Sequence, residues 1–246
     1  MKIQAVLFDL DNTLILFDEK KFFETYSKKL YLSFQDIFSP QEFVQRLISS
    51  TQIMTNNDGK LTNAEFFIND FAKGLPADKN ELWQRFEKFY TTEFEKLEFL
   101  MTPLKGAPEV LLEIKRKGLK IIIASNPMFP TNVQHIRLRW AGLDDLSFDL
   151  ITSAENSTYC KPHLNYYLEI CNKINVKPEN CLMVGNDGFN DMIASKIGMK
   201  TYLTTNSEKF SIEMSRQLAK NTKLEMPAPD YKGHLKDLIK IFGDYS

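Results

Sequence analysis

The sequence predicts an α/β protein with a doubly wound parallel sheet and an all-helical segment inserted after the first strand. Two observations support the sheet: an apolar run at residues 3–8 ends in two aspartates, and apolar runs alternate with helical patterns from Gly106 onward. Such alternation is typical of parallel sheets covered by helices. A third observation supports the insertion, because residues 19–100 show helical patterns and no convincing strand. We therefore expect a core domain of residues 1–17 and 101–246 and a helical domain of residues 18–100.

The first strand carries the most informative residues of the chain. Residues 6–8 (Val, Leu and Phe) predict a buried strand of a parallel sheet. Asp9 follows this strand and Asp11 lies two residues further on, so both carboxylates are expected to face one small space. Adjacent carboxylates repel each other unless a proton or a cation separates them. The pair predicts a magnesium site with one nucleophilic and one proton-shuttling carboxylate.

Helix caps divide the inserted segment. Residues 39–42 (Ser-Pro-Gln-Glu) form a capping box with proline at the first helical position, and residues 62–65 (Thr-Asn-Ala-Glu) form a second box. Gly74 is expected to close the second helix. Asp78 is expected to cap a third helix that continues to about Leu97.

Helices and strands alternate in the rest of the chain. The expected strands cover residues 119–124, 148–151, 181–184 and 201–203. Two expected helices end near Gly118 and Gly142. Three more are expected over about residues 163–174, 190–197 and 233–242.

Composition excludes several classes of function. A formal net charge of -1 gives no general attraction to nucleic acid or to acidic membranes, so we expect neither as a partner. No apolar stretch is long enough to span a bilayer, and the short first run meets Asp9 and Asp11, unlike a signal peptide. The three cysteines lack C-x-x-C spacing and predict reduced thiols in a cytoplasmic protein. The three histidines are scattered, which argues against zinc.

Polar residues also follow other predicted strands. Ser125 and Asn126 follow the second strand, and Lys161 precedes the helix that leads into the fourth. Asp187 and Asp191 follow the fourth strand. In a parallel sheet these ends converge on one edge. The acids suit a hard cation, while the hydroxyl and the lysine suit phosphate oxygens.

These four segments, in order and spacing, resemble the haloacid dehalogenase (HAD) superfamily. The matching features are D-x-D-x-T at residues 9–13, a serine after a strand, a lysine, and an acidic pair after a glycine. The resemblance extends from Met1 to about Thr205 and implies a Rossmann-like core, with the insertion similar to the family's first-type cap. It implies a magnesium-dependent phosphatase that hydrolyses a small phosphorylated metabolite through an aspartyl-phosphate intermediate.

The resemblance also implies roles for individual residues. Asp9 is expected to be the nucleophile, and Asp11 the acid that protonates the leaving alcohol and then activates water. Lys161 is expected to pair with Asp9 and the phosphate, and Ser125 and the backbone of Asn126 to hold the phosphoryl group. The expected metal ligands are Asp9, Asp11, Asp187 and Asp191, with the carbonyl of Leu10 as a further one.

One residue departs from the family pattern. Many relatives have aspartate directly after the glycine of the last motif, where this chain has Asn186. Asp187 and Asp191 lie four residues apart, which places both on one face of a helix that starts there. We expect Asp187 to be the direct ligand, with Asn186 as the alternative.

Other functions remain open at this stage. A phosphomutase needs the same two acids, and the sequence does not distinguish it from a phosphatase. A dehalogenase needs only the nucleophile, and Asp11 counts against it. A receiver module places its acceptor aspartate after a middle strand, where this chain has Ser125. The sequence specifies neither the substrate nor the oligomeric state, and the 19 phenylalanines are interpreted as core.

Overall fold

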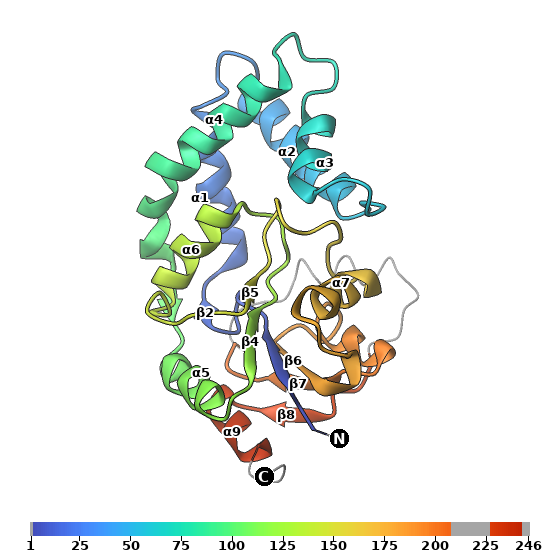
Figure 1. The fold of residues 1–246 in the computed structure, drawn as a ribbon. Helices are drawn as coiled ribbons and strands as arrows, with labels where there is room; N and C mark the ends of the chain where they lie inside the picture. Colours follow the sequence, from blue (N-terminus) through green and yellow to red (C-terminus); the bar gives the residue numbers. More distant parts are fainter. Residues whose placement is uncertain (1, 208–226, 243–246) are drawn as a thin grey trace.

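A six-stranded parallel sheet forms the centre of the molecule (Figure 1). The computed structural model describes residues 2–207 and 227–242. The strand order is β5-β4-β1-β6-β7-β8, and every neighbouring pair is parallel. The strands are β1 (Ala5–Phe8), β4 (Lys120–Ile123), β5 (Leu150–Ile151), β6 (Cys181–Gly185), β7 (Lys200–Thr204) and β8 (Tyr231–Gly233). The predicted doubly wound α/β fold is confirmed.

Helices cover both faces of this sheet, and the side chains of β1 alternate between them. Val6 and Phe8 pack into one apolar cluster, and Ala5 and Leu7 pack into a second. The first cluster includes side chains of α5 (Ala107–Arg116), α6 (Thr131–Trp140) and α9 (Leu238–Ile241). The second includes side chains of α7 (Leu164–Ile174) and the 3₁₀ helix η3 (Met192–Ile197). Burial on both faces explains why β1 is apolar throughout.

The inserted segment is helical, as predicted. Its helices are α1 (Glu19–Tyr31), α2 (Pro40–Met54), α3 (Asn63–Phe71), α4 (Lys79–Thr92) and the 3₁₀ helix η1 (Phe94–Leu100). Both capping boxes are present, at Ser39 and Thr62, and the Asp78 side chain caps α4. The helix that begins after Asp78 ends at Thr92 instead of about Leu97, and the chain continues as η1.

The insertion packs against the sheet, and a short antiparallel ribbon joins its two ends. One apolar cluster contains Phe8 of β1, Phe22 of α1 and Phe86 of α4. The ribbon pairs β2 (Ile15–Leu16) with β3 (Thr102–Pro103). We did not predict this ribbon, because a two-residue strand shows no periodicity. The division into residues 1–17 with 101–246 and residues 18–100 stays a prediction, and residues 1, 208–226 and 243–246 of that core lie outside the described residues.

Two helices expected in the last third of the chain are shorter than predicted and wholly or partly of the 3₁₀ type. A helix was expected over residues 233–242, but the chain forms strand β8 up to Gly233, then the 3₁₀ helix η4 (Leu235–Asp237) and only a short α9. A helix was also expected over residues 190–197, where the structure has turns followed by η3. β8 has three residues and no apolar run, so the pattern that reveals the other strands is missing. Across the described ranges, no helix combines the length and the apolar character that crossing a membrane requires.

Candidate active site

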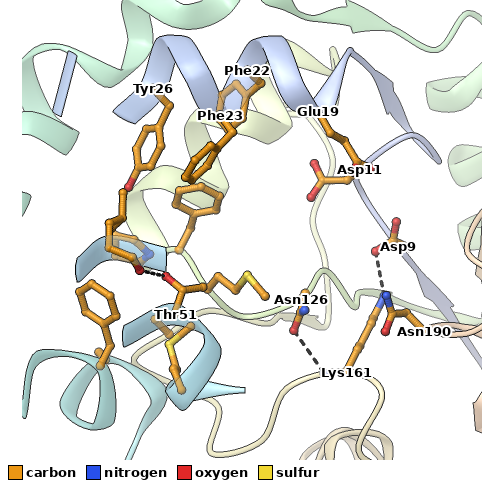
Figure 2. A pocket seen from close by; sticks show the side chains of 18 of the residues that line it. Asp9, Asp11, Glu19, Phe22, Phe23, Tyr26, Thr51, Asn126, Lys161 and Asn190 are labelled. Atoms are coloured by element: carbon orange, nitrogen blue, oxygen red, sulfur yellow. Dashed lines mark hydrogen bonds and ion pairs between the residues drawn. The ribbon is translucent and has the colours of Figure 1, made fainter. Parts of the chain in front are cut away.

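The predicted site residues gather at the carboxyl ends of the central strands, beside a cavity of about 280 Å³. Asp9 follows β1, Asn126 lies after β4, and Asp187 lies after β6. Lys161 reaches the same place from the segment before α7. Figure 2 shows Asp9, Asp11, Asn126 and Lys161 close together at one end of the cavity.

Lys161 lies between two aspartates. Its Nζ donates to Oδ1 of Asp9 at 2.8 Å and to Oδ1 of Asp191 at 2.6 Å, and all three side chains are buried. Burial opposes the charge of the ammonium group, but the attraction of Asp191 and Asp9 raises the pKa of Lys161 well above its usual value. The lysine is therefore charged and holds Asp9 in place.

Burial raises the pKa of each of the two aspartates, whereas it works to lower the pKa of Lys161. Burial raises the pKa of Asp9, the nearby Asp11 raises it further, and Lys161 partly offsets both effects. Burial also raises the pKa of Asp191 to about 7 against the opposing attraction of Lys161, and Asp9 and Asp187 add repulsion. The site thus holds more negative charge than its own lysine compensates.

Asp11 has a partner that sequence reasoning missed. Arg137, on α6, donates to Oδ1 of Asp11, and its guanidinium is 3% exposed. The same guanidinium donates to Oε1 of Gln134 at 2.7 Å and lies over the ring of Phe129. Arg137 and Asp11 are 126 residues apart in the chain, so no local pattern links them.

Ser125 and Asn126 are adjacent in the chain, but only one of them reaches the cavity. Ser125 is fully buried and does not line the cavity; its hydroxyl accepts a long hydrogen bond from Arg137, at 3.4 Å. Its carbonyl accepts from the hydroxyls of Thr152 and Tyr166. Asn126 lines the cavity, and its Oδ1 accepts from the backbone N–H of Lys161 at 3.2 Å. Of this predicted phosphate-binding pair, only Asn126 therefore has direct access to a ligand in this conformation.

The loop after β6 is held by its own aspartates. Oδ1 of Asp187 accepts from the backbone N–H groups of Phe189 and Asn190, and Oδ2 of Asp191 accepts from the N–H of Asp187. The helix expected to begin here starts instead as a turn, in which the N–H of Asp191 donates to the carbonyl of Asp187, and continues as η3. A Cβ atom at Gly185 would lie 2.0 Å from Oδ2 of Asp191, so only glycine fits beside that carboxylate.

Two expected metal donors are already engaged by hydrogen bonds. The carbonyl of Leu10 accepts from the N–H groups of Thr13, Leu14 and Ile15. These hydrogen bonds compete with a metal for that oxygen, and its role as a metal ligand stays a prediction. Oδ1 of Asn186 accepts from the hydroxyl of Thr13 at 3.1 Å, which ties it to the turn after β1.

Glu19 adds a further carboxylate that the sequence did not single out. It begins α1, lines the cavity, and accepts from the Asn12 side chain at 3.2 Å. Burial raises the pKa of Glu19 to about 7, and repulsion from Asp11 contributes further. Asn12 itself adopts a left-handed conformation, with φ of 53°, that turns the chain back toward this site.

The carboxylates around the cavity suit a hard divalent cation. Their oxygens repel each other, and a bound cation would neutralise that repulsion. Within residues 2–207 and 227–242, no three acidic, histidine or cysteine side chains are arranged so that together they could hold a metal ion. Magnesium ordinarily takes only one or two carboxylates and completes its shell with water and phosphate oxygens. The residues present therefore fit magnesium better than an ion that needs an all-protein site.

Comparison with known proteins agrees with this geometry. The pyrophosphatase PpaX of Bacillus cereus is 24% identical over 99% of this chain and 98% of its own length. The glyceraldehyde 3-phosphate phosphatase of Pyrococcus furiosus is 25% identical, over 81% of this chain and 80% of its own. Among solved structures, the HAD-hydrolase YfnB of Bacillus subtilis, bound to magnesium, has a TM-score of 0.57 at 21% identity, covering 99% of this chain and 100% of its own.

The family itself is established by a sequence model. The model of the haloacid dehalogenase-like hydrolases matches residues 3–197, a range that contains β1, the insertion, Lys161 and the loop after β6. The chain belongs to the haloacid dehalogenase-like hydrolase family.

Proposed function

We propose that the protein is a magnesium-dependent phosphatase that hydrolyses a small phosphorylated metabolite through an aspartyl-phosphate on Asp9. The observation that carries this proposal is the buried ion pair between Lys161 and Asp9 at the end of a cavity that Asp11 also lines. The curated relatives, which are named as a pyrophosphatase and a sugar-phosphate phosphatase, support phosphoryl transfer over dehalogenation. We also retain a cytoplasmic location, which the three free, buried cysteines support.

In this proposal a carboxylate oxygen of Asp9 attacks phosphorus while the bond from phosphorus to the ester oxygen breaks. Asp11 gives its proton to the departing alkoxide, so the alcohol leaves neutral. A water molecule then attacks the phosphorus of the aspartyl-phosphate, and Asp11 takes a proton from it. Inorganic phosphate leaves, and Asp9 is a carboxylate again.

Charge placement supports these roles. Lys161 touches Asp9 and has the positive charge that phosphoryl oxygens need, and Asn126 presents a side-chain amide beside it. Asp191 holds Lys161 from the other side. Ser125 would act through Arg137, or directly only after a change in conformation, because it is buried here.

The metal would be held by Asp9, Asp11 and Asp187, with Asn186 as the alternative to Asp187. Asp187, Asn186 and Asp191 all line the cavity, but Asp191 is less exposed than the other two, and its Oδ1 is already paired with Lys161. When bound, magnesium would neutralise the negative charge that develops on the phosphoryl oxygens.

We further propose that residues 18–100 act as a lid over the core formed by residues 1–17 and 101–246. The β2–β3 ribbon, which joins the two ends of the insertion, supports a hinge there. A closed lid would exclude water and strengthen the charge interactions around Asp9.

The proposal is tested by measuring hydrolysis of 4-nitrophenyl phosphate with magnesium and with excess chelator. We expect turnover with magnesium and its loss in chelator. Full activity in chelator would contradict the metal requirement. Release of halide from a 2-haloacid without release of phosphate from any ester would replace the phosphatase with a dehalogenase.

A further inference from the structure

The cavity that contains Asp9 extends between the helices of the insertion, and its far walls are apolar. Figure 2 shows Phe22, Phe23 and Tyr26 on α1, across the cavity from Thr51 on α2. Met128, from the segment after β4, also lines it. The aromatic residues of the insertion were interpreted as core from the sequence, but several of them face this space as well.

The few polar groups in these walls already have partners. The hydroxyls of Tyr26 and Tyr90 form a hydrogen bond with each other at 2.9 Å. The hydroxyl of Thr51 donates at 2.8 Å to a backbone carbonyl one turn earlier in α2. The indole N–H of Trp83 donates at 2.9 Å to a glutamate one turn later in α4. A sugar hydroxyl placed here would lose its hydrogen bonds with water and regain few of them, because these groups already use part of their hydrogen-bonding capacity on each other.

Charge adds a second restriction. Among the described residues that line the cavity, Lys161 carries the one positive charge, and Asp9 and Asp191 both pair with it. Asp11 and Glu19 line the same space with negative charge. A second anionic group on the substrate, such as a carboxylate or another phosphate, would therefore be buried without a cation.

We infer that the substrate is the monophosphate ester of a small, uncharged, apolar alcohol. This inference rests on the proposed phosphatase function. The phosphoryl group would lie against Asp9, Lys161 and Asn126, and the apolar part would lie between α1 and α2. The volume of about 280 Å³ is below the range of roughly 300–1,000 Å³ for drug-sized ligands, so the alcohol is a single ring or a short branched chain.

The test compares esters that differ only in polarity or charge. Cyclohexylmethyl phosphate and glucose 6-phosphate both have a six-membered ring on a primary carbon, and 4-methylbenzyl and 4-carboxybenzyl phosphate differ by one charge. We expect kcat/KM to be at least about tenfold higher for the apolar member of each pair, the scale of selectivity that hydrophobic pockets give. Equal or reversed preference would overturn this inference and leave the phosphatase proposal intact.

Failure of the phosphatase proposal gives a different result from failure of the substrate inference. If none of the four esters and no 4-nitrophenyl phosphate is hydrolysed, the proposed function falls. The inference is then decided by calorimetric binding of the same four esters to the protein. Tighter binding of the apolar members would support an apolar ligand site, and equal or weaker binding would exclude it.

A matched pair of variants locates the preference. Met128→Gln keeps the length of the side chain and adds an amide to the cavity wall. It should lower the ratio of kcat/KM for cyclohexylmethyl phosphate over glucose 6-phosphate by at least about threefold. Met101→Gln, at a half-buried methionine that does not line the cavity, should leave the ratio unchanged. An unchanged ratio in Met128→Gln would contradict the assignment of this wall to the substrate.

Discussion

Arg137 on α6 forms an ion pair with Asp11 in the turn after β1, although 126 residues separate them in the chain. The arginine is almost fully buried, while the aspartate is 34% exposed on its cavity side. The contact links α6, the helix that follows Ser125 in the chain, to Asp11, the proposed general acid and base. We therefore expect Arg137 to position Asp11.

Replacing Arg137 tests this role. Arg137→Met should lower kcat for 4-nitrophenyl phosphate by at least about tenfold, because a positioned acid or base contributes about 10²–10⁴-fold to such reactions. Arg137→Lys should restore part of the loss. Arg139→Met is the matched control, since Arg139 lies on the same helix and makes an exposed ion pair with Glu95. Equal activity of Arg137→Met and Arg139→Met would exclude a positioning role.

The sequence was sufficient for five of the six strands of the sheet and for most residues of the candidate site. The acids after β1 and β6 could be found because parallel strands end at one edge, and the capping boxes at Ser39 and Thr62 are local signals. Asp9 and Lys161 were expected to pair, and the structure brings them to 2.8 Å.

What the sequence missed depends on distant contacts or on very short elements. Arg137 and Glu19 acquire their partners only after the chain has folded, and neither lies in a recognisable motif. The three backbone donors that compete for the carbonyl of Leu10 also come from the folded turn and not from a sequence motif. The phenylalanine content indicated a core but not which rings would also line a cavity.

Asp9→Asn tests the nucleophile. The amide keeps the shape of the side chain but is a poor nucleophile, so turnover should fall by at least about 10³-fold with an unchanged circular dichroism spectrum. Asp36→Asn, at an exposed aspartate that pairs with Arg85, should keep full activity. Near-native turnover in Asp9→Asn would assign the chemistry to another residue.

Magnesium titrations distinguish Asp187 from Asn186. Asp187→Ala should raise the magnesium concentration required for half-maximal activity more than Asn186→Ala does, because a hard cation prefers a carboxylate to an amide oxygen. Thermal unfolding without metal serves as the control, since Asp187 also holds its own loop. The reverse order of the two variants would move the metal to Asn186.

The raised pKa values predict how stability depends on pH. Burial raises the pKa of Glu19 and of Asp191 to about 7, so the folded state keeps protons that the unfolded chain releases at lower pH. Without metal, stability should therefore fall as pH rises from about 4.5 to about 7 and then level off. The measurement is the unfolding midpoint across this range in chelator.

Glu19→Gln should reduce this fall in stability, because it removes a carboxyl group whose ionisation destabilises the folded state. Glu24→Gln, at an exposed position on the same helix, should leave the fall unchanged. Added magnesium should also flatten the curve by stabilising the ionised carboxylates. An unfolding midpoint that rises over the same pH range would show that folding does not disfavour the ionised forms of Glu19 and Asp191.

Asn63 connects the insertion to the core and provides a test of the lid. It is fully buried at the start of α3, and its amide nitrogen lies 3.3 to 3.4 Å from the carbonyls of Pro127 and Tyr159. Its backbone N–H donates to the carbonyl of Ser157 at 2.9 Å. The first turn of α3 is thus held by loops next to Asn126 and Lys161.

Asn63→Ala should weaken this contact without removing any group proposed for chemistry. The carbonyls that lose a donor can be solvated only if the insertion moves away, so the variant should favour an open arrangement. We expect faster hydrogen exchange in α3 and a higher KM for 4-nitrophenyl phosphate, with the same dependence on Asp9. Asn69→Ala is the control on the same helix, because the Asn69 side chain accepts a hydrogen bond from the exposed Lys79 on α4 of the insertion. If exchange in α3 speeds up equally in both variants, or in neither, Asn63 does not hold the insertion closed, and the apolar cluster that includes both Phe22 and Phe8 becomes the next contact to test.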